Sequence, residues 1–509
     1  MGNLRGMNQW RVAGLIALAM FAAWLTLRSC SPQESPPVEQ TAVTARDQFH
    51  ASKPLLVEVT SAAASTELSW LERELRNLLI RGRMRVASIA SSGSPAYTVR
   101  VELAQELPSS ASLKLIAPDG KVEREQSIQL ESDELATMRA FAAVLPGFLG
   151  AAHKTEDWSS YLGTEDAGAY ENFVRSEQEL LGSNGSGFTR PIAAANTENI
   201  DRLENLTRRH PRFSRAWSLL AIAYLNLGGE DEASLTQLAE STAEHALGLD
   251  PSLSDAHSAL GLVQLRRGEW VAAMEHFKTA LETDPNASAA LEGLACLMID
   301  VGHASTALPL AQRAVRLQPG SIGAAECLSY AQLSAGATLT TDAPDGGAKS
   351  LAAAQVEALD AILAGDLRSA QERLQNVNST RKSTPWIEPL MRAAQDKRQT
   401  SQALQAITRA ASDHSIDAVT EVVCGTALRQ SDFVFNRMLR LHKQKEAVPL
   451  RVLWLPRTDF LRQSPRFEEI VSAEGLLPFW QDHGLPDICQ SEPTVYGCKI
   501  KPQKLKKEE

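Results

Sequence analysis

Residues 254–285 read SDAHSALGLVQLRRGEWVAAMEHFKTALETDP, and this stretch decides the fold. It closes on Pro285, and similar helix-forming runs close on Pro251 and Pro319, 34 residues away on either side. Proline cannot continue a helix, so each of the three ends a structural unit. Self-similarity at this period is typical of helix–turn–helix units that stack on one another.

Small and large residues occupy fixed places in this unit. With Pro285 counted as position 32, Gly261, Ala273 and Ala280 fall where two antiparallel helices approach most closely, and Phe277 fills the space between helices. The pattern resembles the tetratricopeptide repeat. One such unit cannot bury its apolar face alone, so about three or more stacked units are needed. The sequence therefore predicts an α-solenoid of tetratricopeptide helix pairs.

The repeats account for most of the chain. Weaker units flank the clear ones, and a polar, Gly-rich break separates them from a second helical stretch. The expected parts are repeats over 165–336, clearest over 215–319, a flexible break at 337–350, degenerate helical repeats at 351–445, a C-terminal module at 446–498 and a basic tail at 499–509.

A small α/β domain is expected over residues 53–152. An apolar strand at 55–60 precedes an amphipathic helix at 66–81, and alternating strand patterns follow. Asp119-Gly120 marks a tight hairpin turn between two of these strands. The layout resembles the N-terminal α/β domain of TolB, as found in bacterial tetratricopeptide proteins with TolB-like regions.

A membrane anchor is predicted near the N-terminus. Residues 12–27 read VAGLIALAMFAAWLTL and carry no charge. A spanning helix needs about 17–25 apolar residues, so 12–28 is expected to form a single transmembrane helix. Residues 1–11 would form a short cytoplasmic N-terminus, and 29–52 a Pro-rich linker. The alternative is a lipoprotein signal that ends at Cys30.

Charge and motifs argue against nucleic-acid binding and catalysis. The net charge is -10 over 509 residues, and no domain-wide basic surface is visible. The sequence contains no Gly-rich phosphate loop, no HExxH and no G-x-S-x-G motif. We therefore expect no enzyme activity, no cofactor, no metal site and no nucleic-acid partner.

A protein or peptide partner is expected on the concave face of the repeats. By resemblance to tetratricopeptide proteins, the first helix of each unit lines that face. The set is apolar with both charges and lacks the paired basic clamp that binds a C-terminal carboxylate. The polar candidates are Arg215, Ser218, Asn226, Asp255, Ser258, Arg266, Glu292 and Asp300.

The six cysteines are interpreted in two ways. Cys489 and Cys498 lie in a segment with little helical pattern, and a disulfide between them would close a loop of about ten residues and stabilise it by roughly 2.5–3 kcal/mol. Cys296, Cys327 and Cys424 fall inside repeat helices and are expected to be small packed residues. Disulfides persist in the periplasm and are rare in the cytosol.

The C-terminal module carries a further resemblance. Its run Leu453-Trp454-Leu455-Pro456-Arg457, followed by Phe479-Trp480, resembles the ending of bacterial tetratricopeptide proteins that often carry a winged-helix regulator or adenylate-cyclase domain. Only eleven residues precede the predicted anchor in this sequence, so the chain is expected to lack the output domain of those proteins. The resemblance implies a periplasmic scaffold or sensor anchored in a bacterial inner membrane, or a signalling subunit whose output domain lies on another chain.

Overall fold

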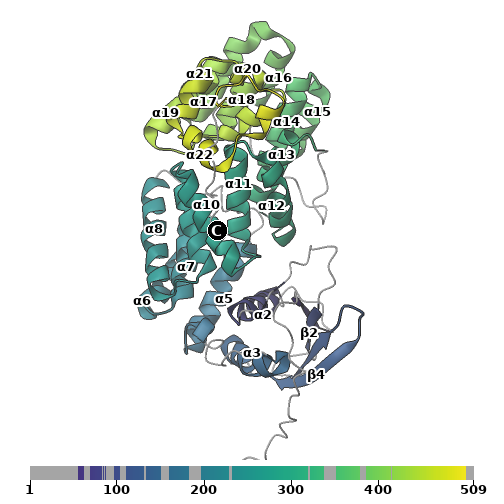
Figure 1. Cartoon of the computed structure of the whole chain (residues 1–509). Helices are drawn as coiled ribbons and strands as arrows, with labels where there is room; N and C mark the ends of the chain where they lie inside the picture. Colours follow the sequence, from purple (N-terminus) through teal and green to yellow (C-terminus); the bar gives the residue numbers. More distant parts are fainter. Residues whose placement is uncertain are drawn as a thin grey trace, which may run out of the picture. The chain divides into compact units, whose positions relative to one another are not determined.

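The computed structural model in Figure 1 describes the chain in segments. All described residues belong to one unit of the chain, residues 51–509. The segments are 55–61, 69–82, 84, 86, 97–103, 110–130, 133–150, 160–182, 197–227, 232–318, 321–337, 351–378, 386–413 and 415–499. Within them, no helix has both the length and the apolar character needed to cross a membrane. The calls on the anchor at 12–28, the linker and Cys30 fall outside the described residues, as does the tail beyond Lys499.

A four-stranded sheet forms the first folded part. Its strands are β1 (Leu55–Ser61), β2 (Tyr97–Leu103), β3 (Ser110–Ile116) and β4 (Val122–Gln129), in that spatial order. Strands β1 and β2 are parallel, and the other two pairs are antiparallel. The predicted hairpin is present, because Gly120 has a positive φ of 85° in the turn between β3 and β4. Helix α2 (Ser69–Arg81) connects β1 to β2, and α3 (Glu134–Leu149) follows β4.

The repeats are paired helices with the predicted period. The first helices of three successive units are α9 (Ser254–Arg266), α11 (Ser288–Asp300) and α13 (Ile322–Ser334), which begin 34 residues apart. Their second helices are α10 (Trp270–Thr283) and α12 (Ala304–Leu317). The pairs that precede them are α5 (Ala167–Gly182) with α6 (Thr197–Arg209), and α7 (Ser214–Asn226) with α8 (Glu232–Leu249). The structure therefore supports a solenoid of tetratricopeptide type that follows a small sheet along the chain.

Phe277 shows why the small residues recur. Its ring is fully buried on α10 and lies against two glycines, Gly261 on α9 and Gly293 on α11. A Cβ atom added at Gly261 would lie 2.6 Å from the ring, closer than packed carbon atoms allow. One aromatic side chain thus joins three helices, and the glycines provide the space for it.

The second half continues as helix pairs. These are α14 (Leu351–Ala364) with α15 (Leu367–Asn378), α16 (Ile387–Gln395) with α17 (Thr400–Ser412), and α18 (Ala418–Ala427) with α19 (Ser431–Gln444). Short elements complete the chain: η4 (Leu450–Trp454), α20 (Asp459–Arg462), α21 (Arg466–Ala473), α22 (Leu476–His483) and η5 (Asp487–Gln490).

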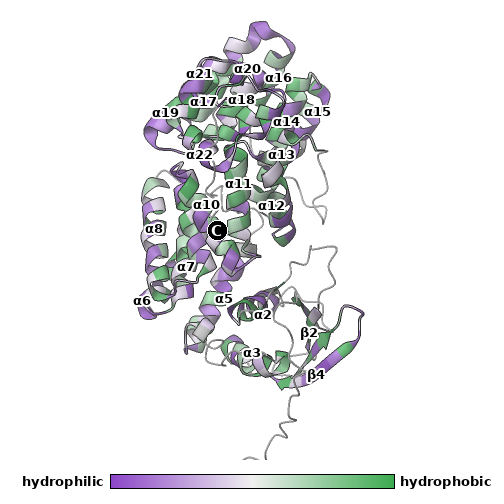
Figure 2. Ribbon diagram, viewed as in Figure 1, coloured by the Kyte–Doolittle hydropathy of each residue, from purple (hydrophilic) through white to green (hydrophobic). Residues whose placement is uncertain are grey.

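The C-terminal module folds back on the middle of the solenoid. Its first element, η4, packs against α11 and α13, although about 150 residues separate them in sequence. Helix α11 is hydrophobic along its length in Figure 2, and every residue from Ala289 to Asp300 is buried. A helix that is apolar all round must be covered on all sides. The C-terminal module contacts α11 at Asp300, a position that would line the concave face in an isolated stack of repeats.

Candidate functional site

The structure buries most of the residues expected to face a partner. Asp255 is exposed and Arg266 is half-buried. The other candidates are at most 6% exposed, namely Arg215, Ser218, Asn226, Ser258, Glu292 and Asp300. These six positions cannot form an open partner surface, because they are buried within the folded chain. Intramolecular contacts of Arg215 and Asp300 show how two of them become buried.

At the N-terminal end, Arg215 on α7 pairs with Glu74 on α2. The guanidinium donates to both carboxylate oxygens, Nη1 to Oε2 at 2.9 Å and Nη2 to Oε1 at 2.5 Å, and Glu74 is fully buried. The rings of Tyr161 and Phe173 lie over the guanidinium, with centroids 4.0 and 4.5 Å from Cζ. Burial alone would raise the pKa of Glu74, but Arg215 and the Tyr170 hydroxyl bring that pKa below its ordinary value. This pair attaches the α/β part to the solenoid.

Arg266 also forms hydrogen bonds within the repeats. Its Nη2 donates to the carbonyl oxygen of Leu225 at 2.5 Å, and its Nη1 lies 3.4 Å from the hydroxyl of Thr236. The side chain therefore connects α9 to the end of α7 and to α8. A partner would have to compete with these hydrogen bonds to reach it.

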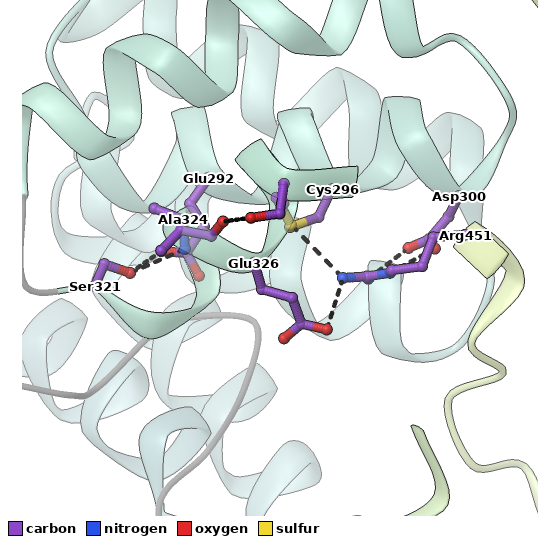
Figure 3. The surroundings of a disulfide bond; sticks show 10 residues. Glu292, Cys296, Asp300, Ser321, Ala324, Glu326 and Arg451 are labelled. Atoms are coloured by element: carbon purple, nitrogen blue, oxygen red, sulfur yellow. Dashed lines mark hydrogen bonds and ion pairs between the residues drawn. A yellow bond between two sulfur atoms is a disulfide. The ribbon is translucent and has the colours of Figure 1, made fainter. Parts of the chain in front are cut away.

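In the middle of the repeats, Asp300 on α11 binds Arg451 of the C-terminal module (Figure 3). The contact is bidentate, with Nε 3.0 Å from Oδ1 and Nη2 2.9 Å from Oδ2. The indole of Trp454 donates to the carbonyl oxygen of Asp300 at 2.8 Å. Nearby, Glu292 accepts a hydrogen bond from the hydroxyl of Ser321 at 2.6 Å. Two of the three carboxylates expected on an open groove, Glu292 and Asp300, are thus satisfied inside the chain.

The described residues contain two disulfides, and only one of them is predicted from the sequence. Cys489 pairs with Cys498, with 5.3 Å between their Cα atoms, as expected. Cys296 on α11 also pairs with Cys327 on α13, with 5.5 Å between Cα atoms, so the expectation of two separate packed thiols is corrected. Their separation of 31 residues is close to one repeat, which places them on adjacent first helices. That spacing was the available sequence signal. Cys424 stays a buried free thiol.

The described part of the chain contains an open cavity next to the repeats. It has a volume of about 660 Å³ and lies between the end of α2, the start of α9 and the end of α10. Asp250 and Asp284 occupy equivalent places before Pro251 and Pro285. The lining residues are Asn77, Ile80, Arg81, Met84, Val86, Tyr161, Arg215, Asp250, Ser252, Leu253, Ser254, Asp255, Glu282, Thr283, Asp284 and Pro285.

The charges around this cavity are unbalanced. Arg81 pairs with Asp250, its Nη2 lying 3.3 Å from Oδ2, and Arg215 is engaged by Glu74. Among the residues that the structure describes, no basic side chain lies within ion-pair distance of Asp255, Glu282 or Asp284. The cavity therefore holds an excess of negative charge.

The pKa of Asp255 reflects this imbalance. The cavity walls restrict the water around the carboxyl and Asp284 lies nearby, and together they raise the pKa of Asp255 from 3.8 to about 6, although Arg215 acts in the opposite direction. Burial raises the pKa of Asp284 as well. Between its unfolded and folded pKa, Asp255 binds more protons in the folded chain, so this group makes the protein less stable as pH rises toward 6.

Asp255→Asn is accordingly expected to raise the melting temperature above pH 6 and to have little effect near pH 3, where the carboxyl is mostly protonated in both the folded and the unfolded chain. Thermal melts of both proteins across this pH range test the prediction. A variant that melts below the parent at neutral pH would contradict the charge imbalance.

No metal site accompanies the cavity in the described part of the chain, where no group of three or more His, Cys, Asp or Glu side chains is arranged to hold an ion. No protein-family model matches the sequence, and no curated protein matches it.

Three solved structures illustrate the structural comparison. The Pseudomonas aeruginosa PilF structure is 15% identical, covers 51% of this chain and 96% of its own, and has a TM-score of 0.29. Naa15/Naa10 bound to HypK-THB is 12% identical, covers 65% and 43%, and scores 0.22. A human IFIT1 dimer with m7Gppp-AAAA is 12% identical, covers 62% and 90%, and scores 0.25. These TM-scores are low, so the fold described above rests on the helix pairs of this chain.

Proposed function

We propose that this protein is a scaffold or sensor that binds another protein, and that an extended segment of that partner enters the cavity between α2 and the repeats. The observation that carries the proposal is the cavity of about 660 Å³, whose carboxylates at Asp255, Glu282 and Asp284 form no ion pair with a described residue. Its volume lies within the roughly 300–1,000 Å³ of typical ligand sites. The predicted concave positions are occupied from within the chain, so the cavity replaces them as the binding site.

The lining defines the kind of segment that would bind. Ile80, Met84 and Pro285 supply apolar contacts, and Ser254 and Thr283 supply hydrogen-bonding groups. A lysine or arginine side chain of the partner would neutralise the carboxylates that form no ion pair with a described residue. We therefore propose a partner segment with a basic side chain flanked by apolar residues.

We also propose that the folded part is attached to a bacterial inner membrane by residues 12–28 and lies in the periplasm. The uncharged run at 12–27 supports an anchor, and the two disulfides favour an oxidising compartment. Protease added to spheroplasts would digest the folded part in this topology. Protection until the inner membrane is lysed would reverse it, and release into the soluble fraction would favour cleavage over anchoring.

The signalling alternative predicts a particular class of partner. If the output domain lies on another chain, that chain should carry a DNA-binding or adenylate-cyclase domain. A photo-crosslinking amino acid at Glu282, compared with one at Val122 on the exposed surface of β4, would identify the protein that reaches the cavity. Crosslinks to the same protein from both sites would argue against the cavity.

The binding test removes two cavity charges. Asp255→Asn with Glu282→Gln is expected to weaken binding of the crosslinked partner at least about tenfold, which corresponds to roughly 1.4 kcal/mol. Asp201→Asn with Glu275→Gln removes the same charge from exposed positions outside the cavity and serves as the control. Titration calorimetry with the purified partner measures both. Equal affinities for the two double variants would refute the proposed site.

A further inference from the structure

The disulfide between Cys296 and Cys327 lies beneath the C-terminal module. Both cysteines are fully buried, and Nη1 of Arg451 lies 3.6 Å from the sulfur of Cys327 (Figure 3). The same guanidinium makes the bidentate contact with Asp300, one turn beyond Cys296 on α11. One residue of the module thus touches both the disulfide and the helix that carries it.

Several further contacts attach the module to the end of α11. The indole of Trp480 donates to the carbonyl oxygen of Val301 at 2.8 Å. The backbone N–H of Asp487 donates to the carbonyl oxygen of Gly302 at 2.9 Å. The carboxylate of Asp487 accepts from the backbone N–H of Ser305 at 2.7 Å, at the start of α12. With the Trp454 contact to Asp300, these bonds hold the module on residues 300–305, which begin one turn after the buried Cys296.

The second disulfide provides an internal comparison. Cys489 and Cys498 are half-buried, and both lie within the module itself. A reductant in solution can approach this bond without any movement of the module. A reductant in the same solution therefore reaches the Cys489–Cys498 bond more easily than the Cys296–Cys327 bond.

We propose that docking of the C-terminal module controls whether a thiol reductant can open the Cys296–Cys327 disulfide, which makes this bond a redox switch set by the position of the module. The inference stands on the buried contact and does not depend on the partner proposed above. Thiol–disulfide exchange requires a thiolate to reach a sulfur, and burial beneath Arg451 prevents that approach.

The chemistry of the switch is a complete two-electron exchange with a dithiol. One thiolate of the dithiol attacks a sulfur of the buried bond and forms a mixed disulfide, and the sulfur that leaves takes a proton. The second thiol of the reductant, after losing its proton, displaces the other cysteine, which is protonated in turn. Two cysteine thiols remain on the protein, and the reductant departs as a cyclic disulfide. Helices α11 and α13 then lose their covalent connection.

The experiment follows reduction of each bond in the full folded chain. The protein is incubated with dithiothreitol without denaturant, quenched in acid, alkylated and mapped by mass spectrometry. Cys489–Cys498 should open first, and Cys296–Cys327 at least about a hundredfold more slowly, because its reduction requires local opening. Arg451→Met should accelerate opening of Cys296–Cys327 at least about tenfold and leave Cys489–Cys498 unchanged.

Arg457→Met is the matched control. Arg457 also belongs to the module but pairs with Asp360 on α14 and is 46% exposed. This variant should reduce like the parent at both bonds. If Arg451→Met does not fold, Trp454→Phe removes the hydrogen bond to Asp300 together with part of the buried indole, and it should accelerate opening of the same disulfide. Equal reduction rates of the two disulfides in the parent would overturn the proposal, as would alkylation of Cys296 and Cys327 without reductant or no acceleration in a folded variant.

Discussion

Glu74→Gln is expected to lower the free energy of unfolding by about 3–5 kcal/mol, because it leaves the Arg215 guanidinium charged, buried and without its counter-ion. Glu74 has no exposed surface, and Arg215 is 6% exposed. Their bidentate contact bridges α2 and α7, which are 141 residues apart in sequence. Urea denaturation followed by circular dichroism measures the change.

The control for this prediction lies on the same helix. Glu72 pairs with Arg76 one turn away, and the two side chains are 27% and 16% exposed. Glu72→Gln should change the free energy by about 0.5 kcal/mol or less, as is usual for such pairs. Equal losses in the two variants would show that Glu74 is not a buried ion-pair partner. Replacement of both Glu74 and Arg215 by leucine should recover part of the loss, since no lone charge is then buried.

Phe277→Ala is expected to cost about 3–5 kcal/mol and to loosen three helices together. The ring is fully buried between Gly261 and Gly293, and no neighbouring side chain extends from either glycine to fill the space. Because each unit of a solenoid is stabilised by its neighbours, hydrogen exchange should rise across α9, α10 and α11. Val271→Ala on the same helix, where Val271 is 39% exposed, should leave exchange unchanged. Loss of protection confined to α10 would contradict the three-helix contact.

Features that depend on neighbouring residues in the chain could be predicted from the sequence. Pro251 and Pro285 defined the period, and the first helices begin 34 residues apart in the structure. Asp119-Gly120 located the hairpin, because such a turn requires a positive φ. The small residues at Gly261 and Ala280 indicated close helix contacts, and both lie in the packed interior.

Long-range pairing could not be predicted in the same way. Arg215, Glu292 and Asp300 occupy positions that face a partner in an isolated stack, and nothing local shows that Glu74, Ser321 or Arg451 satisfies them. The Cys296–Cys327 bond was missed because both cysteines fit a packed helix equally well. Asp255 was correctly chosen as an accessible position, but for a groove, while the structure places it in a cavity with a wall supplied by α2.

We infer that the chain fills the inner face of its own repeats and leaves the cavity open. Asp255 and Ser258 lie one turn apart on α9, yet Asp255 is exposed and Ser258 has no exposed surface. Cysteine substitutions at these two positions, alkylated in the folded chain and mapped by mass spectrometry, compare the two surfaces directly. The account predicts rapid alkylation at Asp255→Cys and at least about a hundredfold slower alkylation at Ser258→Cys, since the latter requires local opening. Equal rates would show that the inner face of the repeats is open and would contradict the account.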